Sequence, residues 1–257
     1  GAEGTWVGPV LEKSKRLLAG SIVAMETKRD VAFVTIGQSP RRDMVDEMVQ
    51  IVRSLHPGRT ALRFRQSGAL DNLDRKEIDW LRPVDHEEVL VTRLQSGETV
   101  KVSENRLEPY MQKAVDRAAS IADLVVLLCT GSFANLHTSV PLVSPDRVFL
   151  SYCFSVLAEG TIGVIVPDES QIEQRLLLWQ ETGGPSTEKI RLKVRAASPY
   201  EGIEPIALAA KELSDCSLIA LDCMGYTFAA KQSVSQIGGP PVALARSVTA
   251  MAVAELL

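Results

Sequence analysis

Two cysteines of this chain occupy matching surroundings. Cys129 stands in "LLCTGSF" and Cys223 in "ALDCMGYT"; each ends an apolar run and is followed two positions later by glycine. If both sulfurs face one ligand from opposite sides, one thiol can remove a proton from a carbon while the other returns a proton to the opposite face. Two other interpretations stay open at this point, a disulfide between the two residues or two small side chains of the hydrophobic core.

The neighbours of these cysteines suggest how a thiol would be activated. A free thiol has a pKa of about 8.5, and hydroxyl donors or the N-terminus of a helix can lower it. We expect Thr130, Ser132 and Thr227 to donate hydrogen bonds at this site. Gly131 and Gly225 would let backbone N–H groups approach an anionic ligand. We therefore expect a helix directly after each cysteine loop, and lowered thiol pKa values.

Composition excludes several classes of partner. The chain has 257 residues, of which 46% are hydrophobic, enough for the core of one large domain or of two lobes. The net charge of −4 at pH 7 gives no basic field for nucleic acid, and no apolar run approaches the length of a transmembrane helix. We therefore expect a small-molecule partner, with neither nucleic acid nor a membrane.

Cysteine and histidine usage indicates the compartment and the absence of a metal site. The four cysteines show no CxxC spacing and are too few to staple a chain of this length, which is typical of a reducing cytoplasm. This disfavours the disulfide, and we expect Cys153 and Cys216 in the core. None of the three histidines stands near a cysteine at metal-ligand spacing, so we expect no metal.

Apolar runs alternate with helical periodicity from residue 31 onward. In the first half the pattern predicts a strand at 31–37, a helix at 39–55, a strand at 60–66, a helix at 72–81, a β-hairpin at 87–104, a helix at 107–121 and a strand at 123–129. We expect Ser39 to cap the first helix with Pro40 at its first position, and Asp71 or Asn72 to begin the second.

The second half repeats this order. It predicts a strand at 161–167, a helix at 168–182 capped by Asp168, a strand at 189–197, a helix at 203–213, a strand at 217–223 and a long Ala-rich helix at 241–257. Both first strands carry "TIG", and strand, helix, strand, helix and strand precede the cysteine in each half, which favours an internal duplication.

The duplication predicts an α/β fold with two similar lobes and parallel sheets. We assign residues 25–145 to the first lobe and 146–257, with the terminal helix, to the second. Residues 1–24 are interpreted as a leader or N-terminal extension before Met25. Ligands of open parallel sheets bind at the carboxyl ends of the strands, where Cys129 and Cys223 both fall.

Five segments carry a family resemblance, namely "FVTIGQSPRRDMV", "SGALDNLD", "LVTRLQSGETVKVSE", "GVIVPDESQ" and "ALDCMGYT". They resemble the AroM family, whose members look like aspartate/glutamate/hydantoin racemase superfamily proteins. The resemblance implies two pseudo-symmetric Rossmann-like lobes with a cleft between them, and cofactor-independent chemistry by one or two cysteines. On this resemblance Cys129 and Cys223 match the catalytic positions. The hairpin at 87–104 is an insertion in the first lobe relative to the common racemase pattern.

The resemblance also implies binding residues in two loops. The loop Gly37–Gln38–Ser39 matches the place where the superfamily holds a substrate carboxylate, although Gln38 stands where glutamate racemases carry an acid. The second cysteine loop would contribute Met224, Gly225, Tyr226 and Thr227.

Arginines are the expected partners of a substrate carboxylate. Arg41 and Arg42 at the start of the first helix, or Arg93 on the hairpin, would bind a carboxylate in a bidentate way, and a solvated side chain is the alternative for each. Tyr226 follows Gly225 directly and is a stronger candidate for the site than His137.

The leading functional hypothesis is a cofactor-independent racemase or isomerase of a small carboxylate, an amino-acid derivative or a hydantoin-like ring. One alternative is a lyase, decarboxylase or hydrolase on the same scaffold in which Cys223 acts alone. Another is a binding protein that keeps the cleft without turnover. Superfamily relatives are often dimeric or larger, so a homo-oligomer is expected.

Overall fold

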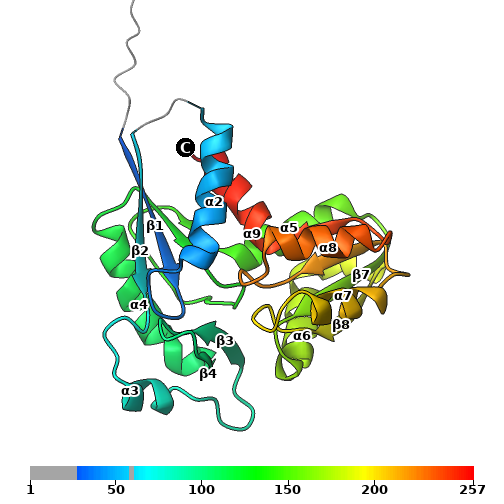
Figure 1. Cartoon of the computed structure of the whole chain (residues 1–257), viewed down its shortest axis with the longest axis horizontal. Helices are drawn as coiled ribbons and strands as arrows, with labels where there is room; N and C mark the ends of the chain where they lie inside the picture. Colours follow the sequence, from blue (N-terminus) through cyan, green and yellow to red (C-terminus); the bar gives the residue numbers. More distant parts are fainter. Residues whose placement is uncertain (1–27, 58–60) are drawn as a thin grey trace, which may run out of the picture.

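A computed structural model describes residues 28–57 and 61–257, and it has two α/β lobes side by side (Figure 1). The proposed extension at 1–24 lies outside the described residues. The first lobe contains a parallel sheet in the order β2-β1-β5-β6, and the second a parallel sheet in the order β10-β9-β7-β8. Reversed, the second order reads β8-β7-β9-β10, in which each strand corresponds to the strand at the same place in β2-β1-β5-β6. This confirms the α/β fold and its repeated scheme.

The strands of the two sheets are short and mostly buried. Those of the first lobe are β1 (Arg29–Thr35), β2 (Leu62–Gly68), β5 (Leu124–Leu127) and β6 (Leu142–Val143), and those of the second are β7 (Gly160–Val166), β8 (Ile190–Ala196), β9 (Leu218–Leu221) and β10 (Val242–Leu244). The central strands β1 and β7 are buried along nearly their whole length because helices cover both faces of a parallel sheet.

The helices differ from the predicted ones mainly at their ends. They are α2 (Arg42–Leu55), α3 (Arg75–Trp80), α4 (Glu104–Ala119), α5 (Pro145–Val156), α6 (Ile172–Gly183), α7 (Glu204–Lys211), α8 (Phe228–Gln236) and α9 (Ala245–Glu255), with 3-10 turns η1 (Glu169–Gln171) and η2 (Gly184–Glu188). The predicted helix at 241–257 was wrong at its start, because residues 242–244 pair with β9 as β10.

Two predicted helix caps were wrong because one aspartate is used elsewhere. Ser39 does not cap α2; its backbone N–H and its hydroxyl both donate to Asp71, at 2.6 and 2.8 Å. Asp71 is thereby unavailable to begin α3, which is capped by Asp74 through the Glu77 backbone N–H at 2.9 Å. Asp168 does act as a cap, but of the turn η1, and α6 begins only at Ile172.

The predicted hairpin is present and joins the two lobes. Strands β3 (Val89–Arg93) and β4 (Thr99–Ser103) pair antiparallel, and Gly97 in their turn has a φ of 88°, a conformation that favours glycine. The hairpin belongs to the first lobe, yet it is bonded to the second. The Val89 N–H donates to Gln174 Oε1 at 3.1 Å, and the Val89 carbonyl accepts from Gln171 Nε2 at 2.9 Å. Lys101 forms an ion pair with Asp168 at 2.8 Å. The hairpin therefore spans the gap between the lobes at one end of the molecule (Figure 1).

The last helix spans the lobes at the other end. α9 packs against α2 of the first lobe and against α5 (Figure 1). His56, just after α2, contacts the Ala254 carbonyl through Nε2 at 2.7 Å. One hydrophobic core contains residues of α2, α9 and both sheets, so the two lobes share buried apolar surface.

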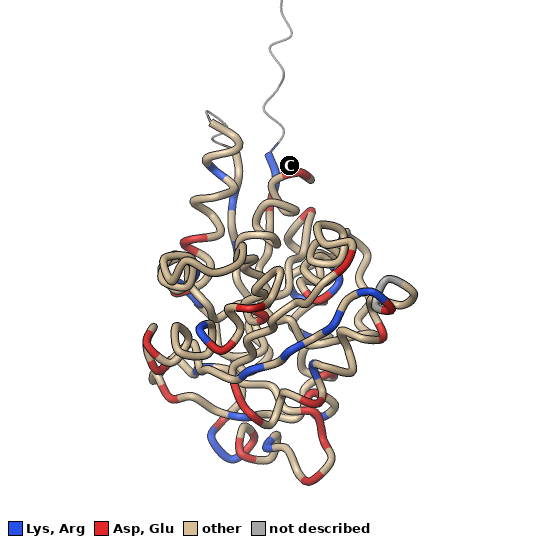
Figure 2. The backbone as a smooth tube through the Cα atoms, turned by 90° about the vertical axis from the view of Figure 1, so that its right-hand side faces the viewer, with Lys and Arg blue, Asp and Glu red and all other residues tan. Residues whose placement is uncertain are grey.

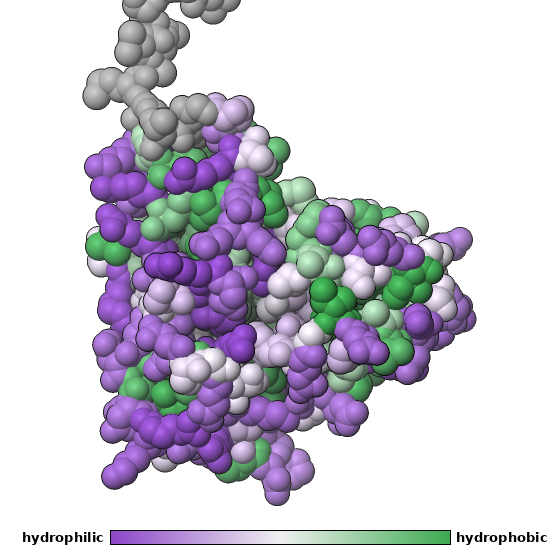
Figure 3. Space-filling view, in the orientation of Figure 1, coloured by the Kyte–Doolittle hydropathy of each residue, from purple (hydrophilic) through white to green (hydrophobic). Residues whose placement is uncertain are grey.

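The surface carries both signs of charge. Basic and acidic positions are interspersed along the backbone in Figure 2, and β8 has basic residues that pair with Asp215 and Glu212. Hydrophilic residues cover much of the face in Figure 3, and apolar residues appear there in scattered patches. Among the described residues, no helix combines the length and apolar character needed to cross a bilayer.

Candidate active site

The two cysteine loops meet at a small cavity between the lobes. Cys129 follows β5 and Cys223 follows the equivalent strand β9, and both side chains line this cavity of about 20 Å³. Its other lining residues come from the hairpin, the cysteine loops, the segment from the end of β7 through η1, and α6, namely Leu90, Val91, Thr130, Gly131, Pro167, Gln171, Gln174, Arg175 and Asp222. The volume is about that of a single water, so a substrate requires the lobes or the hairpin to move.

All four cysteines are free thiols, which removes the disulfide interpretation. Cys153 and Cys216 lie in hydrophobic clusters, as expected for core residues. A wider groove of about 380 Å³ shares Val91 and Pro167 with the cavity and runs between the hairpin and the second lobe. It offers a route by which a ligand reaches the thiols.

The expected lowering of the thiol pKa values was wrong. Burial raises the pKa of Cys223 to about 11 and raises that of Cys129 further, and the backbone N–H groups of Gly225 and Gly131, each 3.2 Å from its thiol, only partly offset this. A helix does follow the Cys223 loop, but the Cys129 loop leads into β6 before α5 begins.

Two of the three hydroxyls predicted to serve the thiols, those of Thr130 and Thr227, have other partners, and Ser132 meets Glu104 through its backbone. Thr130 donates to the Asp222 carbonyl at 3.4 Å, and Thr227 caps α8 by accepting from the Ala230 N–H at 3.1 Å. The backbone N–H of Ser132 lies against the carboxyl of Glu104. Both thiols are therefore protonated at neutral pH in this conformation, and either one needs a proton acceptor before it acts as a base.

A buried ion pair that sequence reasoning missed joins the two cysteine loops. Arg175 donates to both carboxylate oxygens of Asp222, at 2.7 and 2.9 Å, and Trp179 donates to the same carboxylate at 2.8 Å. The Arg175 guanidinium also donates to the Thr130 carbonyl in the first lobe at 2.6 Å. Because the Arg175 and Asp222 side chains are 5% and 0% exposed, this pair is screened little by solvent. The sequence hinted at this ion pair only through Asp222, which directly precedes Cys223.

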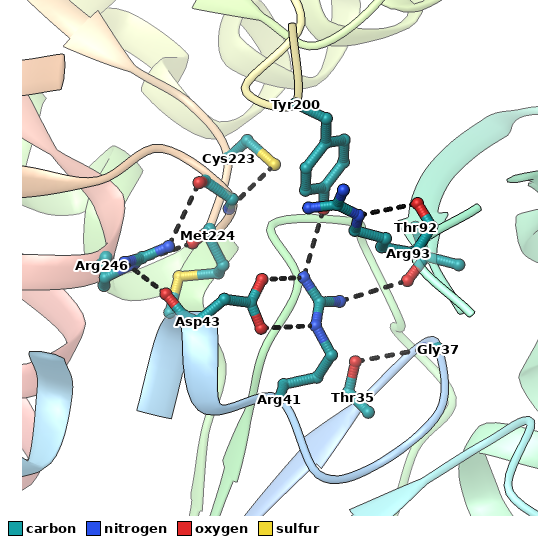
Figure 4. Close-up of polar contacts among 12 residues, drawn as sticks. Thr35, Gly37, Arg41, Asp43, Thr92, Arg93, Tyr200, Cys223, Met224 and Arg246 are labelled. Atoms are coloured by element: carbon teal, nitrogen blue, oxygen red, sulfur yellow. Dashed lines mark hydrogen bonds and ion pairs between the residues drawn. The ribbon is translucent and has the colours of Figure 1, made fainter. Parts of the chain in front are cut away.

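Arg41 and Tyr200 meet beside Cys223 (Figure 4). Arg41 forms two hydrogen bonds with Asp43, at 2.9 and 2.7 Å, and contacts the Tyr200 hydroxyl at 3.4 Å. Burial disfavours the Arg41 charge, but Asp43 and Tyr200 raise its pKa above the usual value. Burial and the nearby Cys223 raise the pKa of Tyr200 to about 12, so its phenol is a hydrogen-bond donor at neutral pH. Tyr200 was not predicted from the sequence.

The loop at residues 37–39, predicted to bind a substrate carboxylate, contacts the hairpin. Gln38 accepts from the Gln95 N–H at 3.0 Å, and Ser39 is half-buried and bound to Asp71. A side chain at Gly37 would overlap the Thr92 hydroxyl, so glycine here permits close approach of β3. These contacts explain the residues structurally, and a role in binding a carboxylate stays a prediction.

The remaining predicted residues have distinct positions. The Arg93 guanidinium lies 5.6 Å from the centre of the Tyr200 ring and its Nε donates to the Gly97 carbonyl at 2.8 Å. Tyr226 is buried and donates to the Ala197 carbonyl at 2.7 Å, so its hydroxyl is used within the second lobe. His137 and Arg42 are exposed at the surface.

Arg246 supports the Cys223 loop from behind. Its guanidinium donates to the carbonyls of Met224 and Gly225, at 3.0 and 3.1 Å, and forms an ion pair with Glu47 of α2 at 2.6 Å. Met224 is buried, and a side chain at Gly225 would approach Pro199 to 2.9 Å. The loop that carries Cys223 is thus fixed by contacts from both lobes (Figure 4).

Two buried polar side chains at the site lack a full set of partners. Gln171 lines the cavity and donates to the Val89 carbonyl, but its buried Oε1 has no hydrogen-bond partner among residues 28–57 and 61–257. Oε2 of Glu104 is likewise buried and has no hydrogen-bond partner among these residues. Within the described part of the chain, no group of three or more His, Cys, Asp or Glu is placed to hold a metal.

Comparison with known proteins identifies the family. The family model described as "AroM protein" matches residues 31–257. The chain belongs to the AroM family. No curated protein sequence matches this AroM-family chain.

Solved structures of low identity share its fold. A glutamate racemase from Francisella tularensis subsp. tularensis SCHU S4, in complex with D-glutamate, is 13% identical with a TM-score of 0.56 and covers 90% of this chain and 81% of its own. An allantoin racemase from Klebsiella pneumoniae is 15% identical with a TM-score of 0.56, and the match covers 89% of this chain and 87% of the racemase. An unliganded arylmalonate decarboxylase is 14% identical with a TM-score of 0.51, and the match covers 89% of this chain and 92% of the decarboxylase.

Proposed function

We propose that this AroM-family protein is a cofactor-independent racemase or isomerase in which Cys129 and Cys223 act as opposed acid and base on one carbon of a small substrate. The observation that carries the proposal is that both thiols line one cavity at the carboxyl ends of equivalent strands. One sulfur accepts the proton of the carbon, and the other thiol donates its own proton to the opposite face. The similar folds of two racemases support this chemistry.

Among small carboxylates, amino-acid derivatives and hydantoin-like rings, we favour the ring. Arg41 and Arg175, the guanidinium groups beside the thiols, already have carboxylate partners in Asp43 and Asp222. Gln171 instead lines the cavity, and its buried Oε1, unpartnered among the described residues, would accept a hydrogen bond from a ring N–H. A ring that delocalises the carbanion also acidifies its carbon without a cofactor.

A thermal-shift screen followed by chiral chromatography tests this proposal. Hydantoins with one substituted carbon, free amino acids and dicarboxylates are compared as ligands, and each stabilising compound is incubated as one pure enantiomer. We expect a stabilising hydantoin to racemise, and Cys129→Ala and Cys223→Ala each to abolish racemisation. Stabilisation without turnover of any compound would instead identify a binding protein.

The second candidate is a one-cysteine lyase or decarboxylase in which only Cys223 acts. The asymmetry of the two thiols favours it, because Cys223 alone is flanked by the Tyr200 phenol and the Arg41 guanidinium. The similar fold of an arylmalonate decarboxylase is consistent with it. Turnover that survives Cys129→Ala, with loss of a carboxyl group as carbon dioxide, would support this candidate over the first.

A further inference from the structure

Glu104 is a buried ionisable group beside the cavity that the chemistry above does not use. It is the first residue of α4, 4% exposed, and its Oε2 has no hydrogen-bond partner in the described residues. Leaving a buried carboxyl oxygen unpaired costs stability. Such a group at the edge of a candidate active site needs an explanation in terms of function.

The position of Gly131 shows how close this carboxyl is to a thiol. A Cβ built on Gly131 would lie 2.9 Å from Glu104 Oε2 and 3.3 Å from Cys129 Sγ. The two atoms are therefore separated by no more than the sum of these distances, a span that one bridging water can cover for proton transfer. Because residue 131 is glycine, no side chain fills the gap between them.

The groups around Glu104 favour its protonated form. Burial, followed by the Glu88 carboxylate at the base of the hairpin, raises the pKa of Glu104 to about 8. The Arg175 guanidinium from α6 and the Ser132 backbone N–H act in the opposite direction, and Cys129 faces the carboxyl from the loop after β5. The first turn of a helix normally favours a carboxylate, so burial outweighs the helix dipole here.

Within residues 28–57 and 61–257, the carboxyl beside the other thiol is already paired. Asp222, next to Cys223, receives hydrogen bonds from Arg175 and Trp179. The phenol of Tyr200 also lies beside Cys223. The two thiols therefore differ in their supply of protons.

We propose that Glu104 is the proton partner of Cys129, acting through this thiol as a positioning residue without touching the substrate. When Cys129 acts as a base, the Glu104 carboxyl first releases its proton to solvent; the S–H bond then breaks, an O–H bond forms on the resulting carboxylate, and the negative charge moves to sulfur. When Cys129 has given its proton to the substrate carbon, the Glu104 carboxyl returns a proton to the thiolate. No electrons are exchanged and no further reactant is consumed. The role rests on the proposed function, but the proton exchange is testable without a substrate.

Infrared titration tests the coupling directly. We expect a protonated-carboxyl band that disappears near pH 8 and is missing in Glu104→Gln, and a Cys129 S–H band, assigned by its loss in Cys129→Ala, that shifts at the same pH. The shift should vanish in Glu104→Gln, return in Glu104→Asp and persist in Glu108→Gln, a control on the same helix. A Cys129 S–H band that ignores the carboxyl titration, or that shifts equally in Glu104→Gln, would overturn the proposal.

Exchange of the substrate proton in D2O gives the second readout. We expect Glu104→Gln to slow the exchange that depends on Cys129 by about 100-fold while leaving the exchange that depends on Cys223 near its wild-type rate. Equal slowing of both exchanges would indicate a structural role for Glu104 and refute the proposal. If no substrate turns over, the proposed function fails while the infrared titration still decides the role of Glu104.

Discussion

Glu104→Gln should make the protein more stable, by an amount that grows with pH. The folded state raises the pKa of this carboxyl from 4.5 to about 8, so the folded protein binds its proton more tightly than the unfolded chain does. Wild-type stability therefore falls as pH rises from about 4.5 to about 8. Each pKa unit corresponds to about 1.4 kcal/mol, which gives a penalty of about 3 kcal/mol at pH 7 and about 5 kcal/mol above pH 8. Glutamine has nearly the same shape and pays no such penalty.

Urea unfolding at pH 5, 7 and 9 measures this difference. The free energy of unfolding of Glu104→Gln should exceed that of the wild type by an increment that is small at pH 5 and largest at pH 9. Glu108→Gln, on the same helix and bonded to Asn135 at the surface, should show no such trend. A Glu104→Gln difference that is the same at all three pH values would refute the raised pKa and the buried-carboxyl reasoning behind it.

Three further predictions follow from the site. Asp222→Asn leaves the buried Arg175 charge without its carboxylate and should cost about 3–5 kcal/mol in urea unfolding, and a loss below 1 kcal/mol would argue against the buried pair. Gly37→Ala should lower the free energy of unfolding by about 1–3 kcal/mol, because the added methyl group overlaps the Thr92 hydroxyl. Calorimetry should show that part of this loss is recovered when Gly37→Ala is combined with Thr92→Ala. The rate of Cys223 alkylation, followed by mass spectrometry of its peptide, should rise with pH without a plateau below about pH 11, and a plateau near neutrality would contradict the raised pKa.

The sequence predicted the fold well because parallel strands and amphipathic helices leave periodic patterns. The runs at 31–37 and 161–167 became β1 and β7, and the alternation at 87–104 became the hairpin. Helix ends were less predictable, since they depend on side chains from distant segments. Asp71 is a clear case, because its bonds to Ser39 move both the start of α2 and the start of α3.

The sequence located the two thiols but not their environment. The matched positions of Cys129 and Cys223 follow from the repeat, and both residues line the same cavity. Their raised pKa values depend on how completely the hairpin and the facing lobe cover them, which no local pattern encodes. Arg175, Tyr200 and Glu104 come from elements far away in the chain, so their convergence required the tertiary structure.

Deuterium exchange on separate enantiomers tests the central claim, two thiols on opposite faces of one carbon. Each enantiomer of a turned-over substrate is incubated in D2O with wild type, Cys129→Ala and Cys223→Ala, and deuterium at the reacting carbon is followed by NMR. We predict that each variant loses exchange of one enantiomer, a different one for each cysteine, and keeps exchange of the other. Loss of both exchanges in Cys223→Ala together with full exchange of both enantiomers in Cys129→Ala would contradict the two-thiol account.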